Sequence, residues 1–244
     1  PISDNRLDKL SEIVNPKKVI PAVMEFVDIA GLVEGASKGE GLGNQFLANI
    51  RETEAIIHVV RAFENDDIVH VSGKVSPVDD IEIINTELVL ADLSTVEKLY
   101  QKSIKNSKSG EKEGILLKNL LEKILPVLEK GESIRQLSFK EEELKILKGF
   151  QLLTLKPVLY VANISESGFK DNVFLDEIIE YAKKDNSKVV AICADVEQQI
   201  SKFDPVEKSE YLLEMGQSDS GLDRLINAGY RLLGLQTYFT ACLL

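Results

Sequence analysis

Cysteines and long apolar runs are both scarce in this chain of 244 residues. The two cysteines, Cys193 and Cys242, provide neither a disulfide framework nor the spacing of metal ligands. No run of about 18 apolar residues occurs, so we expect no membrane-spanning helix and no membrane partner. The first residues also lack the basic and then apolar pattern of a signal peptide. Together these absences predict a reducing, cytoplasmic location.

A glycine-rich phosphate-binding loop is missing as well. No Gly-x-x-x-x-Gly-Lys-Ser/Thr motif occurs anywhere in the sequence. Gly73-Lys74 is followed by Val75, and no glycine stands five residues before Gly73. Without such a loop, we expect the 244 residues by themselves to bind nucleotide poorly and to be inactive as a hydrolase.

Basic residues are outnumbered by acidic ones, 29 to 40, which gives a net charge of −11. This charge argues against non-specific nucleic-acid binding by the protein as a whole, and we expect no DNA partner. One stretch, 98–118, reverses the balance, because its six lysines and two acids sum to +4. The lysines are Lys98, Lys102, Lys105, Lys108, Lys112 and Lys118.

The apolar patterns predict an α/β fold with a mostly parallel sheet. Strands are expected over 19–28, 55–63, 157–163 and 188–194, and helices over 6–14, 43–54, 171–184, 205–215 and 221–233. The strands are mostly apolar, so we expect them to be buried on both faces. The first strand, the helix over 43–54 and the second strand form a βαβ unit, which predicts parallel strands.

More than 90 residues separate the second expected strand from the third, although a crossover needs only about a dozen. Their apolar spacing predicts two long antiparallel helices that are joined at Lys108-Ser109-Gly110, and then a short helix over 140–148. The expected domains are therefore a first part of a nucleotide-binding domain, a helical arm, and a second part of the same domain. Their bounds are 1–80, 81–150 and 151–233.

The segment 28–43 carries the most specific motif. It reads Asp-Ile-Ala-Gly-Leu-Val-Glu-Gly-Ala-Ser-Lys-Gly-Glu-Gly-Leu-Gly. Asp28 would stand at the carboxyl end of a buried strand, where a carboxylate can hold Mg²⁺ beside a nucleotide phosphate. Gly31 lacks a Cβ, so its backbone N–H can approach a γ-phosphate closely. For Asp-x-x-Gly alone, a strand followed by a flexible turn is the simpler alternative.

A second motif, Asn163-Ile164-Ser165-Glu166, follows directly on the strand expected over 157–163. GTPases have Asn-Lys-x-Asp at this place, and the Asp accepts two hydrogen bonds from guanine that adenine cannot donate. Glu166 is one methylene longer, which predicts lost guanine preference and tolerance of adenine. Ala194 ends the next strand, where a backbone N–H could reach the base edge. The alternative for both positions is an ordinary turn at a strand end.

The pattern offers one candidate for the residue that would position the attacking water. Leu32 stands where Ras-like GTPases have a glutamine, and a leucine cannot polarise water. His70 is the candidate catalytic residue, because an imidazole in the loop after the second strand could orient or deprotonate the water. A surface histidine is an equal alternative. His58 lies in the middle of the strand and is expected in the core.

The glycine-spaced segment resembles switch II of the Obg superfamily of P-loop NTPases. Ile29-Ala30 and the Asn-x-x-Glu at 163–166 are similar to the Obg-like ATPase, or YchF, subfamily, and the resemblance runs over essentially all 244 residues. It implies a G-domain-like fold with helices on both faces of the sheet, interrupted by a coiled-coil arm. It also implies a phosphate loop that would precede these residues, and a TGS domain to which 234–244 would lead.

The same resemblance implies chemistry and partners. ATP would be the substrate and Mg²⁺ the cofactor, and the protein would associate with ribosomes. The implied nucleotide-binding residues are Asp28, which would also hold the metal, and Gly31, Asn163, Ile164, Glu166 and Ala194.

Two functions remain open from the sequence: an ATP-hydrolysing enzyme, or a non-catalytic module that binds protein or RNA through its arm. Lys98, Lys102 and Lys105 share one helix face, and Lys108 extends it to the tip. We expect this tip to contact ribosomal RNA, because phosphate backbones attract it and repel the acidic remainder. A solvated lysine face is the simpler alternative.

Overall fold

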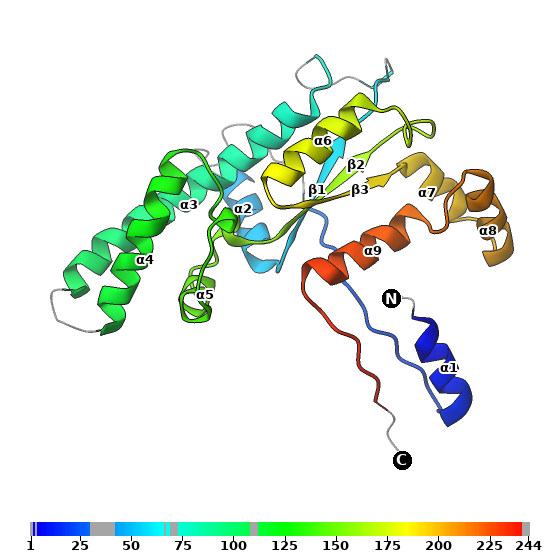
Figure 1. The fold of residues 1–244 in the computed structure, drawn as a ribbon, viewed down its shortest axis with the longest axis horizontal. Coiled ribbons are helices and arrows are strands. Elements are labelled where there is room, and N and C mark those ends of the chain that lie inside the picture. Colours follow the sequence, from blue (N-terminus) through cyan, green and yellow to red (C-terminus); the bar gives the residue numbers. More distant parts are fainter. Residues whose placement is uncertain are drawn as a thin grey trace.

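Three parallel strands form the sheet of the part of the chain that the structure describes (Figure 1). The structure is a computed structural model, and it describes residues 2, 4–29, 42–65, 67–68, 73–107 and 112–240. The strands are β1 (Ile56–Arg61), β2 (Val158–Asn163) and β3 (Lys188–Ile192), in the order β1-β2-β3. In register, Val60 pairs with Ala162 and Ala162 with Ala191. The predicted α/β class with parallel strands is confirmed.

Both faces of the central strand β2 are covered. Tyr160 and Ala162 point to one face and pack in a cluster with Ile178 of α6 (Val173–Lys184). Leu159 and Val161 alternate to the other face and are also buried. The remaining helices outside the arm are α1 (Asn5–Val14), α2 (Leu42–Glu52), α7 (Ala194–Ile200), α8 (Pro205–Glu214) and α9 (Gly221–Leu232). Their bounds agree with the predicted helices to within two residues, except that no helix was predicted over α7.

An antiparallel helical arm projects from the sheet, as predicted (Figure 1). Its two long helices are α3 (Pro77–Ser107) and α4 (Lys112–Glu129). The return path runs through the 3-10 turn η1 (Ile134–Gln136), α5 (Glu141–Lys148) and a second 3-10 turn, η2 (Leu153–Leu155). None of the helices among these described residues is long and apolar enough to cross a membrane.

Helix α3 belongs to the sheet domain and to the arm at once, because its 31 residues contribute to three apolar clusters. Ile81, near its start, packs in the cluster that covers the sheet. Leu88 packs with Leu47 of α2 and Leu153 of η2. Val96, farther along, lies in the core of the arm. The arm is therefore rooted in the sheet domain by a continuous helix.

The strand predicted over 19–28 does not form, and that expectation is wrong. Residues 15–29 contain neither helix nor strand, and Val23 and Val27 are 73% and 59% exposed. A strand requires a neighbour for its backbone groups, and the apolar pattern specifies an extended chain without specifying that neighbour. Burial on both faces also fails for β1, where Val59 is 65% exposed.

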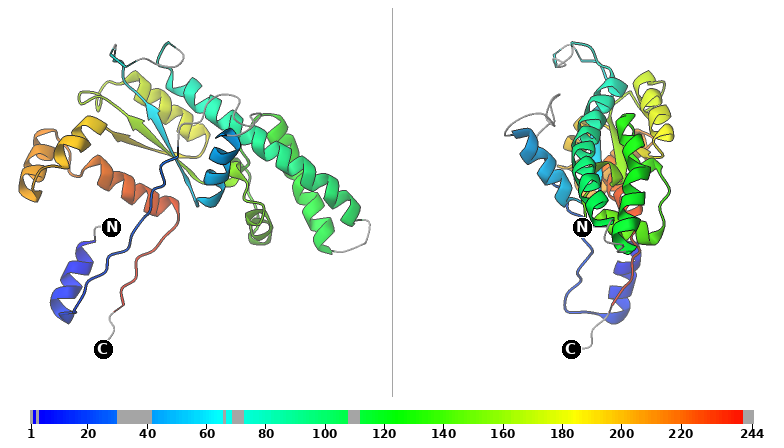
Figure 2. Two further views of the ribbon diagram at one scale, coloured as in Figure 1. Left: turned by 180° about the vertical axis from the view of Figure 1, so that it is seen from behind. Right: turned by 90° about the vertical axis from the view of Figure 1, so that its left-hand side faces the viewer.

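Helix α1 and the segment that follows α9 both extend away from the sheet on the same side of the molecule (Figure 2). Helix α1 meets the segment that follows α9, because the Arg6 guanidinium stacks over the Phe239 ring at 5.3 Å. Met24, in the extended segment after α1, packs against α9. Its sulfur would lie 3.0 Å from a Cβ placed on Gly229, so the missing side chain permits this contact.

Candidate functional site

The carboxyl ends of the three strands are tied together at one edge of the sheet. The Ala62 N–H donates to the Asn163 carbonyl at 2.8 Å, and the Ile164 N–H donates to the Ile192 carbonyl at 2.9 Å. In open parallel sheets ligands bind at this edge, because the loops that leave the strands converge there. The first residues of the loops after β2 and β3 are therefore held in fixed positions relative to each other.

Asn163, the last residue of β2, joins these two loops. Its side-chain oxygen accepts a hydrogen bond from the Ala194 N–H at 3.2 Å. Ala194 is the first residue of α7, and N–H groups in the first turn of a helix lack an acceptor within the helix. The structure thus brings together two residues that the sequence predicted for one site. This hydrogen bond occupies the same Ala194 N–H that was predicted to reach the edge of the base.

Ile164 and Glu166 occupy different environments within the same loop. The Ile164 side chain is 2% exposed and lies in the core, and its N–H is already bonded to Ile192. It supports the loop from beneath, so a contact between this side chain and a nucleotide base has no support in the geometry. Glu166 is exposed, and the turn that carries it is closed by a bond from the Gly168 N–H to the Ser165 carbonyl at 2.9 Å.

Asn172 positions this loop, although sequence reasoning missed it. Its amide nitrogen donates to the carbonyls of Ala62 and Gly168 at 3.1 and 3.2 Å. Its side-chain oxygen accepts from the Leu175 N–H at 3.2 Å and caps the start of α6. An asparagine directly before an apolar helical pattern was the available signal, since such residues favour the N-cap. The hydrogen bond from Asn172 to the Ala62 carbonyl, directly after β1, could not be predicted from that pattern.

The loop after β3 is held from behind by Glu197 of α7. Its carboxylate accepts hydrogen bonds from the N–H groups of Gly221 and Leu222, at 2.6 and 3.1 Å, and so caps α9. Negative charge at a helix N-terminus is also favoured by the helix dipole. A Cβ on Gly221 would lie 2.9 Å from a Glu197 oxygen and 3.0 Å from the Ile192 side chain, so a larger residue would have to displace both. Arg224 of α9 adds a bond to the Ala191 carbonyl at 3.0 Å.

The phosphate side of the predicted site is only partly described. Asp28 is exposed and lies in the extended segment, next to Ile29, which packs against the cluster around α2. Gly31, Leu32 and His70 lie outside the described residues. The loop toward His70 is anchored by Arg61, whose guanidinium donates to the carbonyls of Phe63, Asn65 and Ile68 at 3.1, 3.1 and 2.9 Å.

A metal site built from protein ligands alone is absent from the described part of the chain, where no cluster of three or more His, Cys, Asp or Glu side chains occurs. Mg²⁺ at nucleotide sites usually takes one or two carboxylates and completes its shell with phosphate oxygens and water. The single exposed carboxylate of Asp28 fits that donor set.

His58 lies within β1, as expected, and has no place at this edge. Its ring stands 5.6 Å from the Tyr160 ring. Burial, together with the positive charge of Arg135, lowers the pKa of His58 to about 4. The imidazole is therefore neutral near pH 7, and it is a partly buried side chain of the sheet.

Comparison with known proteins finds one matching family model and several similar chains. Residues 7–90 match the family model described as "50S ribosome-binding GTPase". The "Ribosome-binding ATPase YchF" of Haemophilus ducreyi is 56% identical over 241 residues, covering 99% of this chain and 66% of that protein. The protein of the same name from Bacillus subtilis is 51% identical over 243 residues, covering 98% of this chain and 66% of its own length.

A solved structure, "Structure of the Schizosaccharomyces pombe YchF GTPase", is similar with a TM-score of 0.81 at 33% identity. The match covers 95% of this chain and 64% of that one. The parallel sheet with its joined loops and these similarities define a P-loop NTPase of the G-domain class. Within that class, the chain belongs to the YchF family of the Obg superfamily. It spans 66% of the length of the two curated relatives.

Proposed function

We propose that the whole protein carrying these residues is a cytoplasmic, ribosome-associated NTPase that hydrolyses ATP. The observation that carries the proposal is the bond between Asn163 and Ala194, which joins two loops at the edge where Glu166 is exposed. The two relatives, which are named as ribosome-binding ATPases, support the same function.

The proposed roles follow from the chemistry of each group. Asn163 and the exposed Glu166 would face the base, while Asp28 would hold the shell of Mg²⁺, which supplies positive charge against the phosphates when bound. Gly31 would contact the γ-phosphate through its N–H, and His70 would orient the attacking water. Adenine lacks the two donors that guanine offers to the acid at this place. A carboxylate displaced by one methylene, as in Glu166, should therefore not weaken the binding of ATP.

Nucleotide choice tests this proposal. In the whole protein, titration calorimetry should show ATP binding at least as tightly as GTP. We expect Glu166→Asp to improve GTP binding, because it restores the shorter acid, while Glu177→Asp on the exposed surface of α6 should leave both affinities unchanged. A preference of the unaltered protein for GTP by about tenfold, or about 1.4 kcal/mol, contradicts the proposal.

The ribosome contact is proposed to lie on the arm. Lys98, Lys102 and Lys105 are all exposed on α3, beyond the point where the helix leaves the sheet domain, whereas Lys108 lies outside the described residues. Their positive charge would release counterions from ribosomal RNA, which makes binding depend on salt. These lysines would also be exposed if they only faced solvent, so an experiment must distinguish RNA binding from simple solvation.

Reversal of the four arm lysines to Glu should weaken ribosome co-sedimentation and flatten its dependence on salt. ATP hydrolysis without ribosomes should not change. The matched control reverses four exposed lysines of the sheet domain and alters the net charge equally: Lys170, Lys184, Lys188 and Lys202. Equal loss in both variants would show a general charge effect. Ribosome binding without any ATP turnover would favour the second function, a non-catalytic RNA-binding module.

A further inference from the structure

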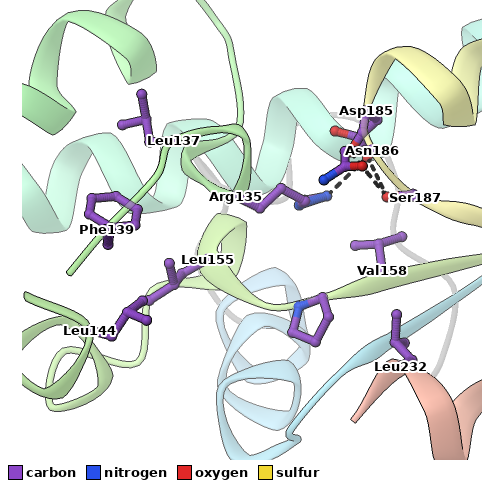
Figure 3. Close-up of a pocket in the computed structure, with 11 residues that line it drawn as sticks. Arg135, Leu137, Phe139, Leu144, Leu155, Val158, Asp185, Asn186, Ser187 and Leu232 are labelled. Carbon is purple, nitrogen blue, oxygen red and sulfur yellow. Dashed lines mark hydrogen bonds and ion pairs between the residues drawn. The ribbon is translucent and has the colours of Figure 1, made fainter. Parts of the chain in front are cut away.

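Two hollows in the described part of the chain differ in charge. One, of about 310 Å³, lies where the return path of the arm meets the amino ends of β2 and β3, and Figure 3 shows Arg135 there beside the turn that carries Asp185. The guanidinium of Arg135 and the carboxylate of Asp185 approach to 3.3 Å, so the charges of this hollow are balanced. The other is a groove of about 600 Å³ on the helical arm, and its charges are not balanced.

This arm groove runs between α3 and α4, the two helices that lie side by side along the arm (Figure 1). Its three glutamates and one lysine give the lining a net charge of −2, and Tyr100, Leu125 and Pro126 add apolar surface. A groove of this kind complements a ligand that is both positively charged and partly apolar. The lining consists of Glu97, Lys98, Tyr100 and Gln101 of α3 and Glu122, Leu125, Pro126 and Glu129 of α4.

The glutamates of the arm groove differ in how far the arm itself neutralises them. Glu122 accepts hydrogen bonds from the Tyr100 hydroxyl at 2.9 Å and from the Lys118 ammonium at 3.1 Å. The bonds from Lys118 and Tyr100 lower the pKa of Glu122, so it stays ionised near pH 7. Glu97 and Glu129 are exposed and form no ion pair with any other described residue. Their carboxylates are open to a cation from outside the chain.

Pro126 adds a backbone acceptor to the arm groove. It lies within α4, and proline has no N–H to donate to the carbonyl four positions earlier, which is that of Glu122. Both residues line the groove, so this carbonyl lies along it. The groove therefore combines carboxylate and carbonyl oxygens with the ring of Tyr100, and both kinds of group attract cationic donors.

We propose that the arm groove binds an extended basic peptide segment of a partner protein, with arginines against the glutamates and apolar side chains against Tyr100 and Leu125. A guanidinium donates in pairs to a carboxylate and stacks on an aromatic ring. Glu122 and Glu129 are seven positions apart on α4, which is about 10 Å along the helix axis. Residues three apart in an extended chain are separated by nearly the same distance, about 9–10 Å, so one peptide can reach both.

Other ligands fit the arm groove less well. An RNA backbone would bring phosphates against three carboxylates, so this partner differs in class from the RNA proposed for the arm lysines. A metal ion needs clustered ligands, and the described residues contain no group of three or more His, Cys, Asp or Glu side chains that could hold one. A purely apolar segment would cover the carboxylates without pairing them. The inference thus goes beyond the function proposed above.

Fluorescence anisotropy with a labelled peptide of three Arg-Leu-Ser repeats tests the proposal on the whole protein. At about 0.15 M salt, where charges more than about 8 Å apart are largely screened, we expect a Kd of about 100 μM or below. A second peptide has citrulline, a neutral analogue of similar shape, in place of arginine. A third has serine in place of leucine. Each should bind at least about fivefold more weakly than the first.

Two paired substitutions separate the arm groove from general attraction to an acidic protein. Glu97→Gln combined with Glu129→Gln removes two charges and keeps the shape of both side chains, so it should weaken peptide binding at least about fivefold. The matched control, Glu177→Gln combined with Glu210→Gln, removes two exposed charges from α6 and α8 and should leave binding unchanged. Equal loss in both variants would overturn the proposal.

A cation placed inside the arm groove gives a second test. Gln101→Arg should compete with the peptide and weaken its binding at least about fivefold, whereas Gln198→Arg, at an exposed position of α7, changes the net charge equally and should have no effect. All these positions are exposed, and thermal melting establishes that each variant is folded. The proposal is wrong if the citrulline peptide binds as well as the arginine peptide, or if the groove variants alter the binding of a duplex RNA while the unaltered protein binds no peptide.

Discussion

Replacement of Asp92 by alanine should destabilise the root of the arm more than any surface change. Asp92 lies in α3 and is fully buried. Its carboxylate accepts hydrogen bonds from the Leu153 N–H at 2.9 Å, the Thr154 N–H at 2.7 Å and the Thr154 hydroxyl at 2.7 Å. Arg51 of α2 approaches it at 4.0 Å. One side chain thus links α3 to η2 and the end of α2.

The size of the effect follows from these contacts. Each buried donor that loses its acceptor costs about 1–3 kcal/mol, and two backbone donors cannot turn elsewhere, whereas the Thr154 hydroxyl can rotate. Burial raises the pKa of Asp92, while bonds from Thr154 and Leu153 oppose that shift. The carboxylate therefore carries a burial cost that its removal relieves. We expect a net loss of about 3 kcal/mol in the free energy of unfolding for Asp92→Ala.

Urea denaturation measures this loss, and amide hydrogen exchange at Leu153 and Thr154 locates it. The control is Glu122→Ala on α4, whose exposed carboxylate pairs with Lys118 at 3.1 Å and should contribute little, because exposed ion pairs are weak in water. If Asp92→Ala costs no more than this control, the three hydrogen bonds do not stabilise the root of the arm, and the reasoning fails.

Three further predictions concern the core and the nucleotide edge. The pKa of His58 lies below its usual 6.5, at about 4, so its stabilising contribution is complete above pH 6.5 and declines as the pH falls toward 4. His58→Phe should remove up to about 3 kcal/mol of this fall in the free energy of unfolding between pH 7 and 4. If the variant and the unaltered protein lose stability equally over that range, the prediction is wrong. Gly221→Ala should lower the stability by about 1–3 kcal/mol and with it the Tm, because the new Cβ would lie 3.0 Å from the buried Ile192 side chain; an unchanged Tm would count against the contact. Asn163→Ala should reduce the nucleotide affinity of the whole protein at least about tenfold, as measured by calorimetry. It should change the free energy of unfolding by less than about 1 kcal/mol, because Ala194 is exposed and water can accept from its freed N–H. A large loss of stability with unchanged nucleotide affinity would show that Asn163 is only structural.

The helices and the parallel strands β1, β2 and β3 could be predicted because their signals are local. Apolar residues recur at helical spacing along α3 and α4, and short apolar runs mark the strands. The strand expected over 19–28 carried the same kind of signal. Its formation depends on a neighbouring strand, which is a property of the whole fold and not of the run itself.

The candidate site could likewise be predicted in part from the sequence. The positions of Asn163 and Ala194 follow from the ends of two adjacent parallel strands, so their meeting could be expected. The burial of Ile164 could not, because a residue at a strand end can face either the core or a ligand. Asn172 and Asp92 were missed since the partners that they reach in other elements lie 61 to 110 positions away in the chain.

The continuity of α3 has a mechanical consequence. A helix of 31 residues is about 46 Å long at 1.5 Å per residue, and its first turns are packed against the sheet domain. If the root tilts by about 5°, the far end of such a rod moves by roughly 4 Å, about the size of a side-chain contact. Small rearrangements near the strands are thereby amplified into displacements large enough to make or break a contact at the tip.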